Sequence, residues 1–284
     1  MRFPAETAAL VALLRAPKRP AAEYASLVEE AGSATVILED EQGLIAPQLL
    51  EEAKPQIEAW NAAGITLFTV LDRGYPPNLR AVHDRPPLIF VAGRLEPDDI
   101  RSVAVIGTRR PSSTGVESAR AVAEELVDAR FTVVSGLATG IDTAAHTAAL
   151  SHGGRTVAVI GTGLNRAYPP QNASLQARIA AEGAVVSQFW PDSPPSRRSF
   201  PKRNAVMSGT ALATVVIEAG QTSGARIQAR LARAHGRPVL LMESLLEQPW
   251  ANELSTRPGT WVIRTPSEIA PLVERLSSTG ALVA

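Results

Sequence analysis

Short apolar runs alternate with longer helical segments along most of this chain, from residue 64 onward. Runs such as SVAVIGT, TVAVIGTG and ATVVIEAG are apolar at nearly every position, which is typical of strands whose two faces are both covered. The segments between them, such as GVESARAVAEELVDA, have the period of a helix. Because alternating strands and helices build parallel sheets, this order predicts an α/β fold with an extended Rossmann-like, doubly wound and mostly parallel sheet.

The expected strands and helices can be placed by residue number. Strands are expected at 65–70, 87–93, 102–108, 131–138, 156–163, 184–189, 213–220, 237–243 and 260–265. Helices are expected at 115–129, 142–153, 172–183, 224–236 and 266–278, with a short one at 204–211. The basic segment before that short helix is expected to be a connection.

The first 62 residues have a different sequence pattern. Segments with a helical period lie at 5–16, 21–32 and 47–64, and breaks that contain proline or glycine separate them. We therefore predict a small helical domain at 1–62 and a Rossmann-like domain at 63–284. The helical segment holds ten acidic residues against five basic ones, so it should repel polyanions and act as an accessory domain.

Composition excludes several classes of site. The chain has 28 basic and 28 acidic residues, so nucleic-acid binding would require a local basic patch. It has no cysteine, which rules out disulfides and thiolate metal sites. The histidines, His83, His146, His152 and His235, are scattered in sequence, so we expect no metal site. With neither a signal peptide nor an apolar run of membrane-spanning length, the expected location is cytoplasmic, without a membrane partner.

The segment SFPKRNAVMSG, residues 199–209, stands out by its charge. Lysine occurs three times in the chain, and Lys202 lies here beside Arg203 and Asn204. Two more arginines precede the segment, and residues 193–217 contain no acidic side chain. The local surplus of positive charge predicts an anionic ligand.

Small, hydroxylated or glycine residues follow several of the expected strands. In a doubly wound sheet, ligands bind beyond the carboxyl ends of the strands, where helix N-termini also attract anions. One such turn is ordinary in this fold, but the set together with Arg109 and the basic segment favours an anion site. The predicted anion-binding residues are Gly107, Thr108, Arg109, Ser135, Gly136, Gly140, Gly161, Lys202, Arg203, Asn204, Ser223 and Gly224.

Motifs of common catalytic and cofactor sites are absent from the sequence. The first strand of the parallel series is followed by GTRRPSSTG, which lacks the dinucleotide pattern GxGxxG. The chain has no GxxxxGK[ST] loop, and the turn at Ser135 does not match GxSxG. We therefore predict no catalytic residues, no cofactor and no metal.

Several motifs together resemble a known family. The segments SGLATGIDTAAH, GTGLNRAYPPQN, FPKRN and VVIEAGQTSGARIQARLA lie within residues 65–238, and this stretch is similar to the DNA-processing protein A family (DprA, also called Smf). At Gln188, at Ala205 and after Met242 the chain departs from the family pattern, as a divergent member would.

The resemblance implies both a fold and a function. It implies an extended Rossmann-like core preceded by a small helical (SAM-like) domain. It also implies a homodimeric protein that binds single-stranded DNA and helps to load RecA during DNA uptake, natural transformation and recombination. Lys202 and Arg203 would then hold phosphates with Arg109 opposite. The aromatic residues Phe189, Trp190 and Phe200 would either stack on bases or pack within the fold, and the sequence leaves both roles open.

An enzymatic alternative uses the same pocket. Related folds include nucleotide-binding sensors and Lonely-Guy-type phosphoribohydrolases, which place a glutamate near a PGGxGT turn. Here the turn reads EAGQTSG, and Glu218 is expected to order it by accepting backbone N–H bonds. Asp142 is expected to cap a helix, and His146 to belong to a structural hydrogen-bond network rather than to carry protons.

Overall fold

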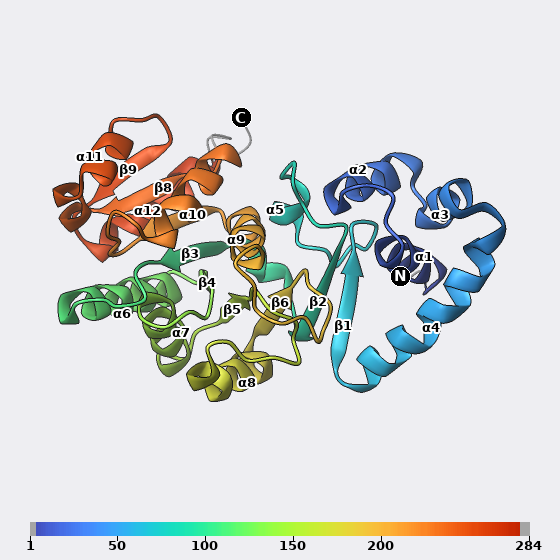
Figure 1. The fold of residues 1–284 in the computed structure, drawn as a ribbon. Coiled ribbons are helices and arrows are strands. Elements are labelled where there is room, and N and C mark those ends of the chain that lie inside the picture. Colours follow the sequence, from blue (N-terminus) through green and yellow to red (C-terminus); the bar gives the residue numbers. More distant parts are fainter. Residues whose placement is uncertain (1–3, 279–284) are drawn as a thin grey trace.

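A computed structural model describes residues 4–278. Within them, a single nine-stranded sheet forms the centre of the molecule, with helices on both faces (Figure 1). Its strands are β1 (Ile65–Thr69), β2 (Leu88–Gly93), β3 (Ser102–Ile106), β4 (Thr132–Ser135), β5 (Thr156–Val159), β6 (Ala184–Ser187), β7 (Ala213–Val216), β8 (Val239–Met242) and β9 (Thr260–Ile263). All strands predicted from the apolar runs are present.

The strand order creates a crevice in the middle of the sheet. The order is β1-β2-β6-β5-β4-β3-β7-β8-β9, and the strands from β6 to β9 run parallel. β1 and β2 extend the sheet with antiparallel pairings. The chain moves outward from β3 in one direction through β4 and β5, and in the other through β7 and β8. The carboxyl end of β3 is therefore the topological switch point, where this fold binds its ligands.

The helices connect the strands and precede them. They are α1 (Pro4–Arg15), α2 (Ala21–Ala31), α3 (Ala34–Gln42), α4 (Ala46–Ala62), α5 (Pro77–Arg80), α6 (Ser113–Asp128), α7 (Ile141–Ser151), α8 (Ala173–Glu182), α9 (Ser199–Thr210), α10 (Gly224–Ala234), α11 (Pro249–Ser255) and α12 (Ile269–Ser278). Short 3-10 turns lie at Gly43–Ile45, Pro97–Ile100, Pro170–Asn172, Glu243–Glu247 and Pro266–Glu268.

The two faces of the sheet bury different sets of side chains. Val103 and Val105 of β3 point to the core that α6, α7 and α12 cover. Ala104 and Ile106 point to the opposite core, which includes residues of α9 and α10. This alternation follows from the two-residue period of a strand, and it explains why the strand runs are apolar at every position.

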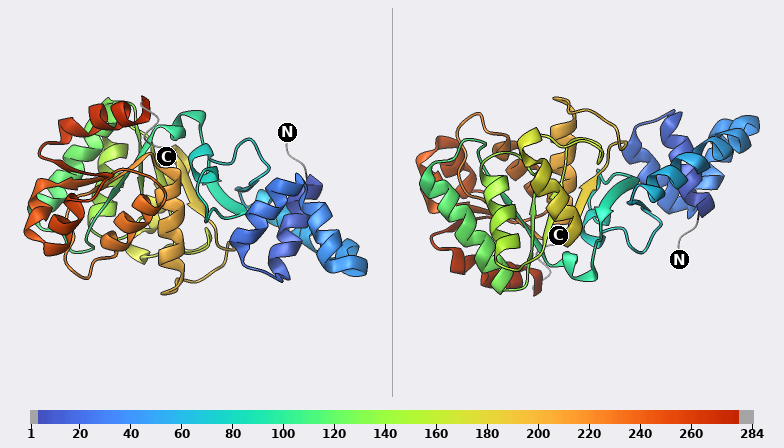
Figure 2. Two further views of the ribbon diagram at one scale, coloured as in Figure 1. Left: turned by 90° about the horizontal axis from the view of Figure 1, so that it is seen from above. Right: turned by 90° about the horizontal axis from the view of Figure 1, so that it is seen from below.

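Aromatic side chains join the N-terminal helices to the sheet. Trp60 of α4 lies edge-on to Phe90 of β2, with ring centroids 5.2 Å apart, and stacks on Trp190 at 5.8 Å. The guanidinium carbon of Arg15 lies 4.0 Å from the centroid of Trp190. Figure 2 shows these helices at one end of the molecule, beyond β1. Trp190 is therefore a packing residue of this junction, which is one of the two roles expected for it.

Three helical elements longer than one turn differ from the expectation, and the single-turn α5 was not expected either. α9 begins at Ser199 rather than near residue 204, so the basic segment is helical and not a connection. Ser196 and Ser199 start the helix, since each backbone N–H bonds to the other hydroxyl, and Pro201 is compatible with a first turn. α3 and α11 are additional helices that the periodicity did not indicate.

None of the helices in the described part of the chain combines the length and apolar character required to cross a membrane.

Candidate nucleic-acid interface

A cleft of about 540 Å³ lies at the switch point of the sheet. Its floor is the turn after β3, and its walls are α9 and the turn between β7 and α10. Of the predicted set, it is lined by Gly107, Thr108, Arg109, Arg203, Asn204, Ser223 and Gly224. Residues from widely separated parts of the sequence therefore meet at the position where this fold binds ligands.

The two predicted arginines of this cleft differ in their exposure. Arg109 is exposed on the turn after β3, whereas the side chain of Arg203 is only 7% exposed. Burial lowers the pKa of Arg203, and the positive charge of Arg109 lowers it further. Asp142 opposes this shift, since its carboxylate Oδ2 lies 4.0 Å from Nη1 of Arg203. Arg203 and Arg109 thus place two positive charges at one cleft, which the carboxylate of Asp142 also lines. An anion in the cleft would relieve their repulsion.

Asp142 is the ion-pair partner of the buried arginine. Burial raises the pKa of the Asp142 carboxyl, although Arg203 acts in the opposite direction. Nη1 of Arg203 also donates to the carbonyl of Val159 at 3.3 Å, while its Nε has no hydrogen-bond partner. The guanidinium therefore retains unused hydrogen-bonding capacity inside the cleft wall.

Three of the predicted glycines make room for the walls of the cleft. A Cβ atom at Gly136 would lie 1.3 Å from Nη1 of Arg203, and one at Gly161 would lie 2.8 Å from the ring of Phe200. Gly140 has a φ of +83°, and its Cβ would lie 2.4 Å from the carbonyl oxygen of Thr108. These glycines permit close packing of the groups that form the site.

The N-terminus of α10 opens onto the cleft. Ser223 caps this 11-residue helix by accepting the backbone N–H of Ala225 at 3.2 Å. A Cβ added at Gly220 or Gly224 would meet nothing within 4 Å, so the turn before the helix is open. The positive end of the helix dipole is therefore accessible to an anion.

The N-terminus of α6 is occupied by a carboxylate of the protein itself. Glu218 accepts the backbone N–H of Ser112 at 3.1 Å and its hydroxyl at 2.7 Å. A Cβ at Gly115 would lie 2.0 Å from Oε2 of Glu218, so glycine leaves room for this carboxylate. Glu218 therefore accepts a backbone N–H as expected, but the donor is Ser112 before α6 and not the EAGQTSG turn. Its carboxylate is outside the lining of the cleft and lines a separate cavity of about 330 Å³.

Two of the predicted residues lie elsewhere than at the cleft surface. Ser135 is completely buried, and its hydroxyl donates to the carbonyl of Val105 at 2.6 Å. Lys202 is exposed on α9 and is not among the residues that line the cleft. Neighbouring residues of a helix point about 100° apart, so Lys202 and Arg203 cannot both face the same point.

Other residues complete the cleft although the predicted set omits them. Arg110 and Arg197 line it, which raises its positive charge. Phe200 separates it from a smaller cavity of about 100 Å³, and the guanidinium carbon of Arg109 lies 5.4 Å from the centroid of its ring. The one signal in the sequence for Arg197 is its place just before the basic segment.

The network around His146 is structural, as expected. His146 is completely buried, and its Nδ1 lies 2.7 Å from the hydroxyl of Thr156. Burial lowers its pKa to about 3, so the ring stays neutral. The expectation that Asp142 caps the helix is wrong, because Gly140 is the N-cap of α7 and Asp142 lies in its first turn. From there, Asp142 accepts the N–H of Ala138 at 3.3 Å.

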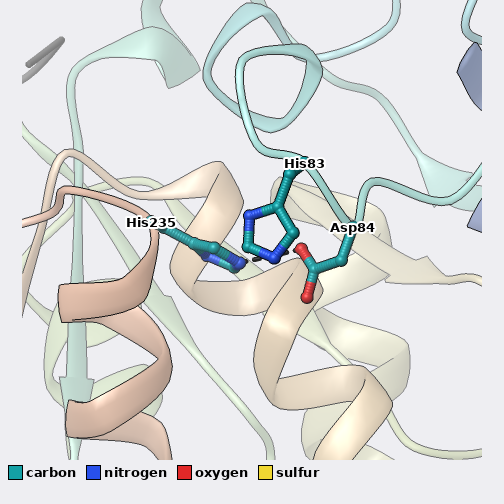
Figure 3. A group of neighbouring side chains, drawn as sticks. All are labelled: His83, Asp84 and His235. Atoms are coloured by element: carbon teal, nitrogen blue, oxygen red, sulfur yellow. Dashed lines mark hydrogen bonds and ion pairs between the residues drawn. The ribbon is translucent and has the colours of Figure 1, made fainter.

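The histidines are less scattered in space than in the sequence. His83 and His235 meet beside Asp84, away from the residues that line the cleft (Figure 3). The expectation of isolated histidines is therefore wrong for this pair, because the segment after α5 folds back against the end of α10.

Comparison with known proteins identifies the family. The family model for DNA recombination-mediator protein A matches residues 66–269. Protein Smf of Synechocystis is 42% identical over 59% of this chain and 43% of its own length. The DNA processing protein DprA of Streptococcus pneumoniae is 42% identical over 61% of each chain. The chain thus spans about half the length of these relatives.

Solved structures agree with this result over the whole fold. The crystal structure of DprA from Streptococcus pneumoniae has a TM-score of 0.76 at 30% identity, and the match covers 95% of this chain and 98% of that one. DprA from Helicobacter pylori has a TM-score of 0.66 at 25% identity, with 74% of this chain and 96% of that chain covered. The chain belongs to the DNA recombination-mediator protein A family, whose members include the DprA and Smf proteins.

Proposed function

We propose that this chain binds single-stranded DNA without strong sequence preference and assists DNA processing in transformation and recombination. The relative from Helicobacter pylori is described by its mode of single-stranded DNA binding, and the relatives by sequence are DNA processing proteins. The observation that carries the proposal is the pair Arg109 and Arg203 at one cleft, beside the open N-terminus of α10. Guanidinium groups and helix N-termini both recognise phosphate oxygens.

The geometry suggests a division of roles along the strand. Arg203 is fixed in the wall by Val159 and Asp142, so it would hold one phosphate in a defined place. Arg109 and Arg197 are exposed at the cleft and would contact the neighbouring phosphates of the strand. Lys202 is exposed on α9 and would contact the strand outside the cleft. Phe200 lines the cleft and is suitably placed to stack on a base.

We also propose that the cleft binds without catalysing a reaction. A phosphoribohydrolase requires a carboxylate at the reacting carbon. Glu218 instead holds the N-terminus of α6 through Ser112, and Asp142 is buried next to Arg203. These contacts favour a binding site over the hydrolase alternative.

The proposal also includes two protein partners, a second copy of this chain and a recombinase. We propose that the chain acts as a homodimer and that RecA is the recombinase to which it delivers bound DNA. Both parts rest on membership of a family described as recombination mediators.

Fluorescence anisotropy tests the proposal directly. Labelled oligothymidylate is titrated with wild-type protein, and unlabelled duplex DNA or nucleoside monophosphates are added as competitors. We expect saturable binding that duplex DNA and nucleoside monophosphates leave largely intact, whereas an excess of the unlabelled oligothymidylate should abolish it. Competition by a monophosphate at equal molar concentration, with release of free base, would favour the nucleotide-binding alternative.

The matched variants are Arg109→Ala and Arg120→Ala. Both residues are exposed arginines, but Arg120 lies on α6 in an ion pair with Glu124 and outside the cleft lining. Loss of one charged hydrogen bond to phosphate should weaken binding about tenfold in Arg109→Ala. Arg120→Ala should bind like the wild type, and equal effects of the two substitutions would argue against the cleft as the site.

A further inference from the structure

His83, Asp84 and His235 form a compact group of metal-ligand side chains. Their ligand atoms all lie within 4.8 Å of one another, and within residues 4–278 no second group of three or more such residues occurs. His83 and Asp84 lie between α5 and β2, and His235 directly follows α10. Figure 3 shows both rings and the carboxylate converging on one place.

His235 is held in position by its neighbours. Its side chain is 0% exposed, and its Nδ1 lies 2.8 Å from the hydroxyl of Ser208 on α9. That hydroxyl donates to the carbonyl of Ala205 at 3.2 Å, which leaves its oxygen available to accept a hydrogen bond from a protonated Nδ1. A histidine whose second nitrogen donates in this way presents the lone pair of Nε2 outward, as metal-binding histidines do.

The outward nitrogen faces a carboxylate. Nε2 of His235 lies 2.8 Å from Oδ1 of Asp84. A lone pair and a carboxylate at this distance repel each other unless a proton or a cation lies between or beside them. Two ligands of one tetrahedral ion at bond lengths of about 2.0 Å lie roughly 3.3 Å apart, so a zinc ion would require these two atoms to separate by only about 0.5 Å.

We propose that His83, Asp84 and His235 bind one divalent transition-metal ion, with Zn²⁺ as the best match. Two imidazoles and one carboxylate suit zinc and its neighbours, whereas Mg²⁺ and Ca²⁺ prefer sites made of oxygen alone. His83 is exposed, and its ring centroid lies 5.5 Å from that of His235, so a small rotation brings it onto the ion. Water completes the coordination from the open side.

The position of the site gives the ion a structural role. The C-terminal end of α10 carries the negative end of the helix dipole, which favours a cation. Arg85 follows the two loop ligands and donates through Nε to Glu29 of α2 at 2.8 Å. An ion here would fasten the loop before β2, and through it α2, to the helix whose other end borders the cleft. Its binding does not depend on whether the cleft holds DNA.

A second histidine and carboxylate pair provides the control. Nε2 of His152 lies 2.9 Å from Oδ1 of Asp128, and both side chains are partly exposed. This pair belongs to no group of three ligands in the described residues. His152→Ala therefore removes a similar pair without affecting the proposed site.

Isothermal titration of the chelator-treated full chain with ZnCl₂ tests the proposal. The wild type should bind one ion per chain, and MgCl₂ should give no saturable signal. His83→Ala, at an exposed position, should fold normally by circular dichroism and weaken zinc binding about tenfold or more. His152→Ala should leave the affinity unchanged.

Visible absorption spectroscopy with Co²⁺ provides a second measurement of metal binding. Co²⁺ added to the wild type should give visible absorption bands of a nitrogen-and-oxygen site, and these should disappear in His83→Ala. The absence of stoichiometric zinc binding to the wild type would show that His235 and Asp84 form a plain hydrogen bond, and the proposal would be wrong. Equal loss of zinc affinity in the His83 and His152 variants would also overturn it.

Discussion

The guanidinium of Arg203 lies directly against the backbone of Gly136. A Cβ atom at residue 136 would approach Nη1 of Arg203 to 1.3 Å, far inside any permitted contact. Gly136 begins the turn after β4 and Arg203 lies on α9, so the two elements approach this closely only because residue 136 has no side chain. The position of the buried charge in the cleft therefore depends on a glycine that itself need not touch the ligand.

Gly136→Ala should displace Arg203 and destabilise the fold. Overpacking of a closely packed site costs about 1–3 kcal/mol, and here the displaced group is charged. Urea denaturation measures the free energy of unfolding. Gly224→Ala is the control, because its Cβ would meet nothing within 4 Å and the residue begins a helix. A Gly136→Ala protein as stable as the wild type would show that Arg203 leaves its position at little cost.

Stability should fall in mild acid because of His146. The pKa of this buried ring is lowered to about 3, while the unfolded chain takes up the proton near 6.5. Between these values the unfolded state binds more protons, so the free energy of unfolding decreases as the pH falls through this window. The decrease is up to about 1.4 kcal/mol per pH unit.

Two histidine variants isolate this effect from the carboxylates. His146→Asn removes the titrating group, so its stability should change less steeply between pH 6.5 and 4 than that of the wild type. His152→Asn alters an exposed histidine and should retain the steep dependence. Equal slopes for the wild type and His146→Asn would contradict the assignment.

Trp60→Ala should loosen the N-terminal helices without affecting the cleft. Trp60 stacks on Trp190 and lies edge-on to Phe90, and its partial burial suggests a loss of about 2 kcal/mol. Leu44→Ala, at a fully exposed side chain, should be neutral. DNA affinity should be unchanged in both variants, in keeping with an accessory role for residues 1–62.

The contacts of Trp60 with Phe90 and Trp190 determine how removal of residues 1–62 would affect stability. The net-acidic charge of this segment still predicts that a chain without it binds single strands. Removal also exposes Phe90 and Trp190, so the shortened chain should be less stable than the full chain. A folded shortened protein that has lost most of its DNA affinity would place the helices in the binding surface.

The strands were predictable because a strand that is buried on both faces is apolar at nearly every position, as in SVAVIGT. The turn residues Thr108, Arg109 and Ser223 were predictable for a related reason, since the carboxyl ends of parallel strands meet at one edge. The start of α9 was not, because SFPKRN has no apolar period that would reveal a helix.

Features that depend on burial or on contacts between distant residues could not be predicted from the sequence. Arginine is seldom buried, so its residue type gives no warning that Arg203 lies in the wall of the cleft. His235 and Asp84 are 151 residues apart in sequence, and only the folded chain brings them together. The sequence left both base stacking and packing open for Trp190, and only its contact with Trp60 decides for packing.

The salt dependence of single-stranded DNA affinity tests the central claim most directly. The logarithm of the affinity for oligothymidylate is plotted against the logarithm of NaCl concentration for the wild type, Arg109→Ala and Arg120→Ala. If Arg109 contacts a phosphate in the cleft, its removal should lower the magnitude of the slope by about 0.7, while Arg120→Ala should keep the wild-type slope. A slope that is the same in all three proteins, or a wild type that does not bind single-stranded DNA, would contradict the account.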